Sequence, residues 1–196
     1  MGKNWCGNSK FRKNNLQIAA SSMDWIPLNK FYLTGEELPN IVRAVQSYTL
    51  AGSGTASRKT EENISLLGYR HVLLTPSCTS ALQIAAICLG IGPGDEIIIP
   101  SYTFVATANP FVNAGARIIF ADSLSDHPNV DCEAIISLLT KRTKAIVLVH
   151  YAGMACEIEK IRKQCAAQNI AIIDDSAHAF YSRDSGGAWT GTSGDI

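Results

Sequence analysis

The strongest constraint on the fold is a regular alternation of short apolar runs with longer helical stretches, which begins after Tyr69. Runs rich in Ile, Val and Leu are typical of strands buried on both faces, and they occur at 71–76, 96–100, 117–122, 144–150 and 170–175. Helix-like spacing of apolar residues fills the intervals at 79–90, 106–114, 132–139 and 157–168. One helix between successive strands implies right-handed crossovers, so we expect an α/β fold with a mainly parallel sheet and helices on both faces.

The composition limits the classes of partner. The chain has 196 residues, with 17 Lys and Arg against 17 Asp and Glu, and only 17% are charged. Soluble domains usually carry about a quarter, so much of the chain is expected in a core or a subunit interface. A net charge of zero gives no field that collects nucleic acid, and no apolar stretch suits a membrane span or a signal peptide. We therefore predict a cytoplasmic protein without nucleic-acid or membrane partners.

The cysteines favour reduced thiols. Six are present, and none forms a CxxC pair. A chain of this length does not need disulfides for stability, so the cysteines are expected mostly in the core. No metal site is predicted.

The region before the alternation divides into a leader and two helices. Residues 1–24 are predicted to form a flexible basic leader, because the first 23 contain four cations and no acid. A basic arm for an acidic partner, or a non-native start upstream of Met23, are the alternatives. Helices are predicted at 36–47 and 60–67, joined by a Gly/Ser-rich connection that lacks the GxGxxG and GKS patterns of phosphate loops.

Candidate binding residues follow the predicted strands, because ligands of such sheets bind beyond the carboxyl ends of the strands. Ser77 to Ser80 place hydroxyls and free amides at a helix amino end, which suits either a phosphate or ordinary helix capping. Phe104 follows the next run, where an aromatic ring stacks on a planar ligand or covers the core.

The run at 170–175 ends in two carboxylates, Asp174 and Asp175. A carboxylate at the end of a hydrophobic strand is costly unless it is paired or used. Alternation along a strand directs one of the two toward the site and the other aside. His178 follows closely, and a histidine at such a position is more often structural than catalytic.

These positions together match three of the four contacts that a pyridoxal 5'-phosphate (PLP) site needs. The cradle holds the phosphate and the aromatic side chain stacks on the ring. The carboxylate bonds the pyridinium nitrogen and keeps it protonated. The fourth contact is a lysine that forms a Schiff base.

Five strings carry a family resemblance by their order and spacing. They are LLTPSCTSALQIAA, GDEIIIPSYTFVATANPFVNAGARIIFAD, VHYAGMACEIEKI, IIDDSAHAF and GTSGDI. The chain resembles the sugar-nucleotide aminotransferases of the DegT/StrS family from Ile26 to Ile196. The resemblance implies that residues 25–196 form the large domain of a type I aminotransferase-like fold, truncated before a small C-terminal domain. It also implies a homodimer with active sites at the subunit interface.

The resemblance assigns cofactor contacts residue by residue. Thr79 and the amide of Ser80 correspond to the groups that meet the PLP phosphate, and Phe104 corresponds to the residue that stacks on the ring. Asp175 corresponds to the partner of the pyridine nitrogen, and His178 stands where the family has Gln or His near the ring oxygen.

Three residues next to these positions have roles that the resemblance leaves less direct. Asp175 is preferred to Asp174 because it begins the family's D-x-A-H/Q pattern. His150 and Tyr151 end the preceding run on the same side, and contact with the nucleotide sugar and a structural role are both open for them.

The family's Schiff-base lysine belongs to a pattern like SFHxTK after GTSGDI, and no residue of this sequence matches it. The last lysine is Lys163, so no catalytic residue is assigned and the 196 residues are expected to be an inactive N-terminal portion. Their exposed edges are expected to make them poorly soluble or oligomeric. The resemblance implies that the whole enzyme transfers an amino group from glutamate to a nucleotide-linked 4-keto-6-deoxyhexose.

Three other functions remain open from the sequence. A non-catalytic PLP-fold fragment or pseudoenzyme would bind without turnover. A PLP-dependent sugar dehydratase of the same family carries histidine in place of the lysine. A nicotinamide-binding Rossmann domain fits the alternation but lacks GxGxxG between its first strand and helix, where SCTSAL stands.

Overall fold

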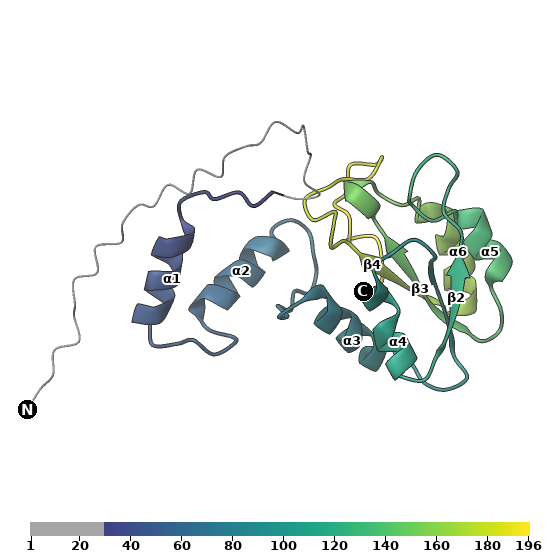
Figure 1. Cartoon of the computed structure of the whole chain (residues 1–196), viewed down its shortest axis with the longest axis horizontal. Coiled ribbons are helices and arrows are strands. Elements are labelled where there is room, and N and C mark those ends of the chain that lie inside the picture. Colours follow the sequence, from purple (N-terminus) through teal and green to yellow (C-terminus); the bar gives the residue numbers. More distant parts are fainter. Residues whose placement is uncertain (1–29) are drawn as a thin grey trace, which may run out of the picture. The chain divides into compact units, whose positions relative to one another are not determined.

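The computed structural model describes residues 30–196, so the predicted leader lies outside the described residues (Figure 1). The chain divides into two units after Gln46. The described part of the first unit contains the helix α1, Glu37–Gln46, which confirms the predicted helix. Its first turn is held by the Glu37 carboxylate, which accepts hydrogen bonds from the amide and hydroxyl of Thr34 and the amide of Gly35.

The second unit contains a parallel sheet of four strands, which form at four of the five predicted runs. The strands are β1 (Glu96–Pro100), β2 (Arg117–Ala121), β3 (Thr143–Val149) and β4 (Ala171–Asp175). Their order is β2-β1-β3-β4, and every neighbouring pair is parallel. The carboxyl ends of all four strands therefore lie at one edge of the sheet.

Helices cover both faces of the sheet (Figure 1). One face packs against α3 (Cys78–Cys88) and α4 (Asn109–Asn113), and the other packs against α5 (Cys132–Leu138) and α6 (Glu159–Gln168). The interior strand β1 contributes to both cores, because Ile97 and Ile99 pack against α3 and α4 and Ile98 packs against α5 and α6. This two-sided burial explains why the strands read as unbroken apolar runs.

The segment 71–76 is not a strand, which corrects the prediction. A strand needs a neighbour for its amide and carbonyl groups, and none of the described strands pairs with this segment. Its side chains are largely exposed, with Leu73 71% accessible. The apolar pattern identified residues suited to a strand, but pairing is a long-range property that the local sequence does not contain.

Two predicted helices have different limits. The helix expected at 60–67 is α2, Thr55–Ser65, and it begins directly after Gly54 inside the predicted connection. The helix expected at 106–114 is interrupted, with a short 3-10 turn η1 (Val105–Thr107) followed by α4. Pro110 explains the interruption, because it has no N–H to donate to the carbonyl four residues before it.

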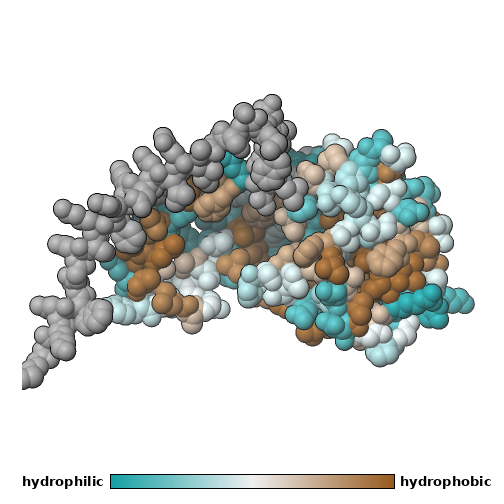
Figure 2. Space-filling view, viewed as in Figure 1, coloured by the Kyte–Doolittle hydropathy of each residue, from teal (hydrophilic) through white to brown (hydrophobic). Residues whose placement is uncertain are grey.

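The five described cysteines are free, and Cys132, Cys156 and Cys165 are buried as predicted for core thiols. Figure 2 shows hydrophobic surface over α1 and over the part that holds the sheet. Such surface often marks contact with a partner. No helix in the described part of the chain has the length and apolarity needed to cross a membrane.

Candidate active site

Asp175 is the last residue of β4, and its position follows from the alternation of the strand. Ile173 packs toward α3 and α4, whereas Ile172 packs toward α5 and α6. Two residues further on, Asp175 shares the side of Ile173 and Asp174 shares the side of Ile172. Asp175 is 7% exposed, so its carboxylate needs partners.

Three donors from different segments converge on the Asp175 carboxylate. The Cys78 thiol, on the first residue of α3, lies 3.6 Å from Oδ1, and the backbone amide of Ala177 donates to the same oxygen at 3.2 Å. The Thr107 hydroxyl, at the end of η1, donates to Oδ2 at 3.3 Å. The amino end of α3, the turn after β1 and the end of β4 therefore meet at this residue.

The amino end of α3 is capped by Ser77. Its Oγ accepts a hydrogen bond from the amide of Ser80 at 3.2 Å, so one of the two groups expected to meet a phosphate is already engaged. The amides of Cys78 and Thr79 precede the first amide that finds a carbonyl within the helix, that of Ala81. Capping and anion binding are therefore compatible here, with Thr79 exposed at the helix end.

Phe104 stands directly before η1, and its ring is 73% exposed. Its carbonyl accepts a hydrogen bond from the Thr107 amide at 2.9 Å, so the turn that presents the ring also presents the hydroxyl that contacts Asp175. An exposed ring on the same turn as a hydroxyl that contacts a buried carboxylate suits a planar cationic ligand.

His178 lies three residues after Asp175 and is exposed. Its ring meets the Tyr151 ring edge-on, with centroids 5.1 Å apart. Tyr151 also packs against Tyr102, and the two hydroxyls are 3.4 Å apart. His178, Tyr151 and Tyr102 thus form an aromatic group at the carboxyl edge of the sheet.

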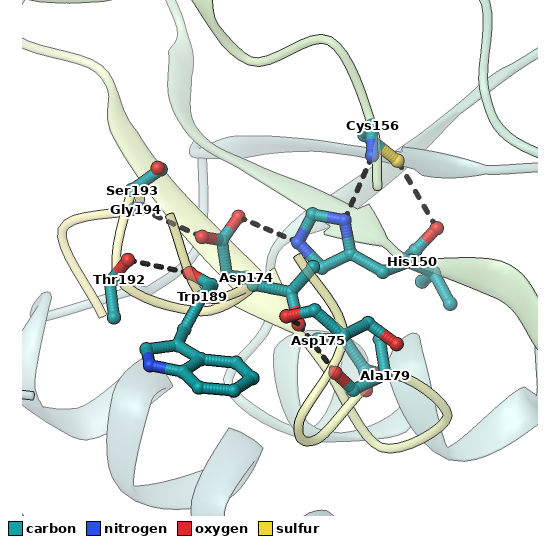
Figure 3. Close-up of polar contacts among 12 residues, drawn as sticks. His150, Cys156, Asp174, Asp175, Ala179, Trp189, Thr192, Ser193 and Gly194 are labelled. Carbon is teal, nitrogen blue, oxygen red and sulfur yellow. Dashed lines mark hydrogen bonds and ion pairs between the residues drawn. The ribbon is translucent and has the colours of Figure 1, made fainter. Parts of the chain in front are cut away.

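The other strand-end carboxylate has a structural environment (Figure 3). Asp174 and His150 have fully buried side chains, and Nε2 of His150 faces Oδ1 of Asp174 at 3.4 Å. Nδ1 of His150 accepts a hydrogen bond from the amide of Cys156, so the neutral ring carries its proton on Nε2, toward the carboxylate. The amide of Gly194 donates to Oδ2 of Asp174 at 2.7 Å. His150 therefore serves the fold on the side of the strand away from Asp175.

The Cys78 thiol is held in its protonated form. Burial, followed by the nearby Asp175 charge and the hydrogen bond to Asp175, raises the pKa of Cys78 to about 11. A protonated thiol is a hydrogen-bond donor and a poor nucleophile.

Sequence reasoning missed Thr107. The residue is 2% exposed and contacts Asp175 directly, yet it stands within a run that looked like an ordinary helix. A signal was present in the spacing of Thr103 and Thr107, since hydroxyls four residues apart lie on one side of a helical turn. Their oxygens are 2.9 Å apart.

The predicted residues lie around an open edge rather than inside an enclosed cavity. A cavity of about 620 Å³ lies elsewhere, between residues 124–133 and the loop at 184–193, and His150 is on its wall. Asp175, Phe104 and Thr79 are not among its lining residues. Lys163, the last lysine, is on α6, which packs against the opposite face of the sheet from Asp175.

Comparison with known proteins identifies the family of the chain. The model of the DegT/DnrJ/EryC1/StrS aminotransferase family matches residues 32–196. The chain belongs to this family. Membership excludes the Rossmann alternative and confirms the resemblance found in the sequence.

Individual relatives agree with the family match. The spore coat polysaccharide biosynthesis protein SpsC of Bacillus subtilis is 32% identical over 157 residues, which are 80% of this chain and 40% of SpsC. The aminotransferase from Psychrobacter cryohalolentis has a TM-score of 0.73 at 31% identity, over 78% of this chain and 40% of its own. NtdA from Bacillus subtilis, solved with bound cofactor PMP, has a TM-score of 0.66 at 30% identity, over 74% and 34%. The chain thus spans about 40% of the length of the relatives it matches first.

Proposed function

We propose that this chain provides the cofactor-binding part of a PLP-dependent aminotransferase that acts on a nucleotide-linked sugar. The observation that carries the proposal is the convergence of Cys78, Thr107 and Ala177 on the buried Asp175 carboxylate. The relative NtdA, with its bound PMP, supports the choice of cofactor.

The chemistry of the donors around Asp175 fits a pyridinium ring. In residues 30–196 no ion pair involves Asp175, and its partners are a thiol, a hydroxyl and an amide. A buried carboxylate stabilised only by neutral donors attracts a cationic N–H group. The ring nitrogen of PLP is such a group.

The remaining contacts are assigned by the same reasoning. The first amides of α3, with Thr79, would hold the phosphate, and Phe104 would cover one face of the ring. The family resemblance places His178 near the ring oxygen of the bound cofactor. When bound, PLP supplies an electron sink for the carbon beside the transferred amino group. Asp175 keeps the ring nitrogen protonated, which is the state in which the ring withdraws electrons most strongly.

The substrate proposal is finer than the family match. The strings TPSCT and VHYAGMACE resemble dTDP-4-amino-4,6-dideoxygalactose transaminase in detail. We therefore propose a nucleotide-linked 4-keto-6-deoxyhexose as amino acceptor and glutamate as donor, in a cytoplasmic homodimer. The Tyr102 and Tyr151 rings provide an apolar wall on the same edge of the sheet, which suits a hexose.

Cofactor binding is tested first with the 196-residue chain. PLP is titrated against wild type, Phe104→Ala and a matched control, Phe120→Ala, which removes a 59% exposed ring from β2. We expect Phe104→Ala to weaken binding about 10-fold, the scale of an aromatic stacking contact, and Phe120→Ala to leave it unchanged. Absence of PLP binding, or equal losses in both variants, would contradict the cofactor proposal.

Amino transfer is tested with the whole protein that carries this chain. We expect 2-oxoglutarate to form from glutamate when the keto sugar nucleotide is present, and Asp175→Asn to slow this by about 10²-fold or more. The 196 residues alone are predicted to give no turnover. Loss of water from the sugar without an amino donor would instead identify a dehydratase, and PLP binding without either reaction would identify a non-catalytic protein.

A further inference from the structure

Thr103 and Thr107 form a hydrogen-bonded chain that ends on Asp175. The Thr107 Oγ1 atom is 2.9 Å from the Thr103 Oγ1 atom and 3.3 Å from Oδ2 of Asp175. Thr107 is 2% exposed, so bulk water does not take its place. The three residues come from η1 and the turn before it and from the end of β4, at the carboxyl edge of the sheet.

The direction of these two hydrogen bonds follows from the number of protons that each group can donate. A carboxylate only accepts hydrogen bonds, so the single hydroxyl proton of Thr107 points to Asp175. The Thr107 oxygen is then free to accept, and the hydroxyl proton of Thr103 points to it. Hydroxyls linked in one direction polarise each other and strengthen the final bond to the carboxylate.

We propose that Thr103 and Thr107 are positioning residues that hold the Asp175 carboxylate in the orientation that a cationic ring nitrogen requires. This inference rests on the proposed cofactor site. The backbone strengthens the argument, because the Thr107 amide also donates to the carbonyl of Phe104 at 2.9 Å. One short turn thereby fixes both the ring that covers the ligand and the hydroxyl that orients its anionic partner.

The alternative is that Thr107 only fills space in the core. The positioning role and the packing role of Thr107 differ in which substitution preserves function. Thr107→Val keeps the size and branching but removes the donor, which leaves Oδ2 of Asp175 without its hydroxyl partner. Thr107→Ser keeps the donor and removes a methyl group. A positioning role predicts that Ser substitutes for Thr, and a packing role predicts that Val does.

The main experiment measures PLP affinity and the protonation of bound PLP in the 196-residue chain. Affinity comes from titration, and protonation from the chemical shift of ¹⁵N in the pyridine ring. We expect Thr107→Val to weaken binding about 10-fold or more and to shift the ¹⁵N signal toward the unprotonated ring, with Thr107→Ser close to wild type. Thr103→Val is expected to act in the same direction with a smaller loss.

Two controls separate positioning from folding. Thr143 is a buried threonine at the opposite end of the sheet, so Thr143→Val is expected to leave PLP affinity unchanged. In an Asp175→Asn background, Thr107→Val is expected to cause little further loss, because the two residues act through one contact. An equal loss in both backgrounds, or a wild-type affinity in Thr107→Val, would overturn the proposal.

A separate measurement in the absence of PLP keeps the inference independent of the cofactor. The Asp175 Cγ resonance is assigned by its disappearance in Asp175→Asn in a chain labelled with ¹³C at aspartate Cγ. We expect Thr107→Val to displace this resonance and Thr107→Ser to restore it. If wild type binds no PLP, the proposed function fails, but the Asp175 resonance still tests the hydrogen-bonded chain from Thr103 through Thr107 to Asp175. An undisplaced resonance in Thr107→Val would overturn the proposed positioning role.

Discussion

The Cys78 thiol lies 3.6 Å from Oδ1 of Asp175 and joins the first residue of α3 to the last residue of β4. The two residues are 97 positions apart in the sequence. They meet because α3 packs on the face of the sheet toward which Asp175 points, and because its amino end lies at the carboxyl edge of the strands. The contact places a helix amino end, which attracts anions, next to a carboxylate, which attracts cations. A ligand that carries both charges suits such a site.

The rate at which Cys78 is alkylated depends on its contact with Asp175. With its pKa raised to about 11 from 9.0, Cys78 holds roughly 10²-fold less thiolate at pH 8 than a thiol of pKa 9.0, and we expect slow alkylation by iodoacetamide. Burial is the largest single cause of the raised pKa, so Asp175→Asn is expected to accelerate alkylation only in part. Peptide mass spectrometry measures the rate, with the exposed Cys88 as internal comparison. An Asp175→Asn rate equal to wild type would show that the two groups do not interact in solution.

Much of this site was predictable because it depends on short-range patterns. The apolar runs predicted β1 to β4, and alternation along the last run predicted that Asp174 and Asp175 point to opposite sides of the sheet. The preference for Asp175 came from the family's D-x-A-H/Q pattern and stays a prediction. Capping by Ser77 was one of the two roles that the local sequence offered, whereas the sequence left open whether Phe104 is exposed or covers the core.

The parts that the sequence did not predict depend on distant contacts. The segment 71–76 has the composition of a strand, but whether it pairs depends on residues far from it in the sequence. Thr107 was missed because a hydroxyl inside a helical run usually faces solvent or its own helix. The burial of His150 against Asp174 joins two strands and a loop, and neither residue alone indicates it.

Acid sensitivity is predicted for the opposite edge of the sheet. Glu96 begins β1, and the Thr140 hydroxyl and then the Arg142 and Arg117 charges lower its pKa below 4.5, against the opposing effect of burial. The Glu96 carboxylate therefore takes up a proton at a higher pH in the unfolded chain than in the folded chain. The stabilisation is complete above pH 4.5 and is lost as the pH falls through the lower folded pKa.

The test replaces Glu96 by Gln. We expect Glu96→Gln to lower the free energy of unfolding at pH 7 and to reduce the loss of stability below pH 4.5. Urea unfolding at pH 7 and at several values below 4.5 measures both quantities. Glu133→Gln, at an exposed position on α5, is the control. A pH dependence in Glu96→Gln as steep as in wild type would assign the acid sensitivity to other groups.

The contact between the buried side chains of His150 and Asp174, with Nε2 and Oδ1 3.4 Å apart, is predicted to stabilise the fold. His150→Leu removes the group that faces Oδ1 of Asp174 and the acceptor of the Cys156 amide, and we expect a loss of about 3 kcal/mol in the free energy of unfolding. The double variant His150→Leu, Asp174→Leu is expected to lose less than the sum of the two single variants, because it leaves no buried charge without a partner. Additive losses in urea unfolding would argue against the pair.

Gly194 packs closely against β4. A Cβ at this position would lie 3.0 Å from Cγ of Asp174 and 3.0 Å from the carbonyl oxygen of Ile172. Residues 194–196 run beside β4, where the amide of Asp195 donates to that same carbonyl and the Gly194 amide donates to Asp174. Gly194→Ala must therefore push this segment away from the strand edge and weaken both contacts.

We expect Gly194→Ala to lower the free energy of unfolding by about 1–3 kcal/mol, the usual cost of forcing an extra carbon into a packed contact. Gly52→Ala is the matched control, because nothing lies within 4 Å of the position of its Cβ. Hydrogen exchange at the amide of Gly194 separates the local effect from a global one. The exchange rate is expected to rise in a variant that remains folded, since Asp174 no longer holds that amide. Wild-type stability and exchange in Gly194→Ala would mean that the segment does not pack against β4 in solution.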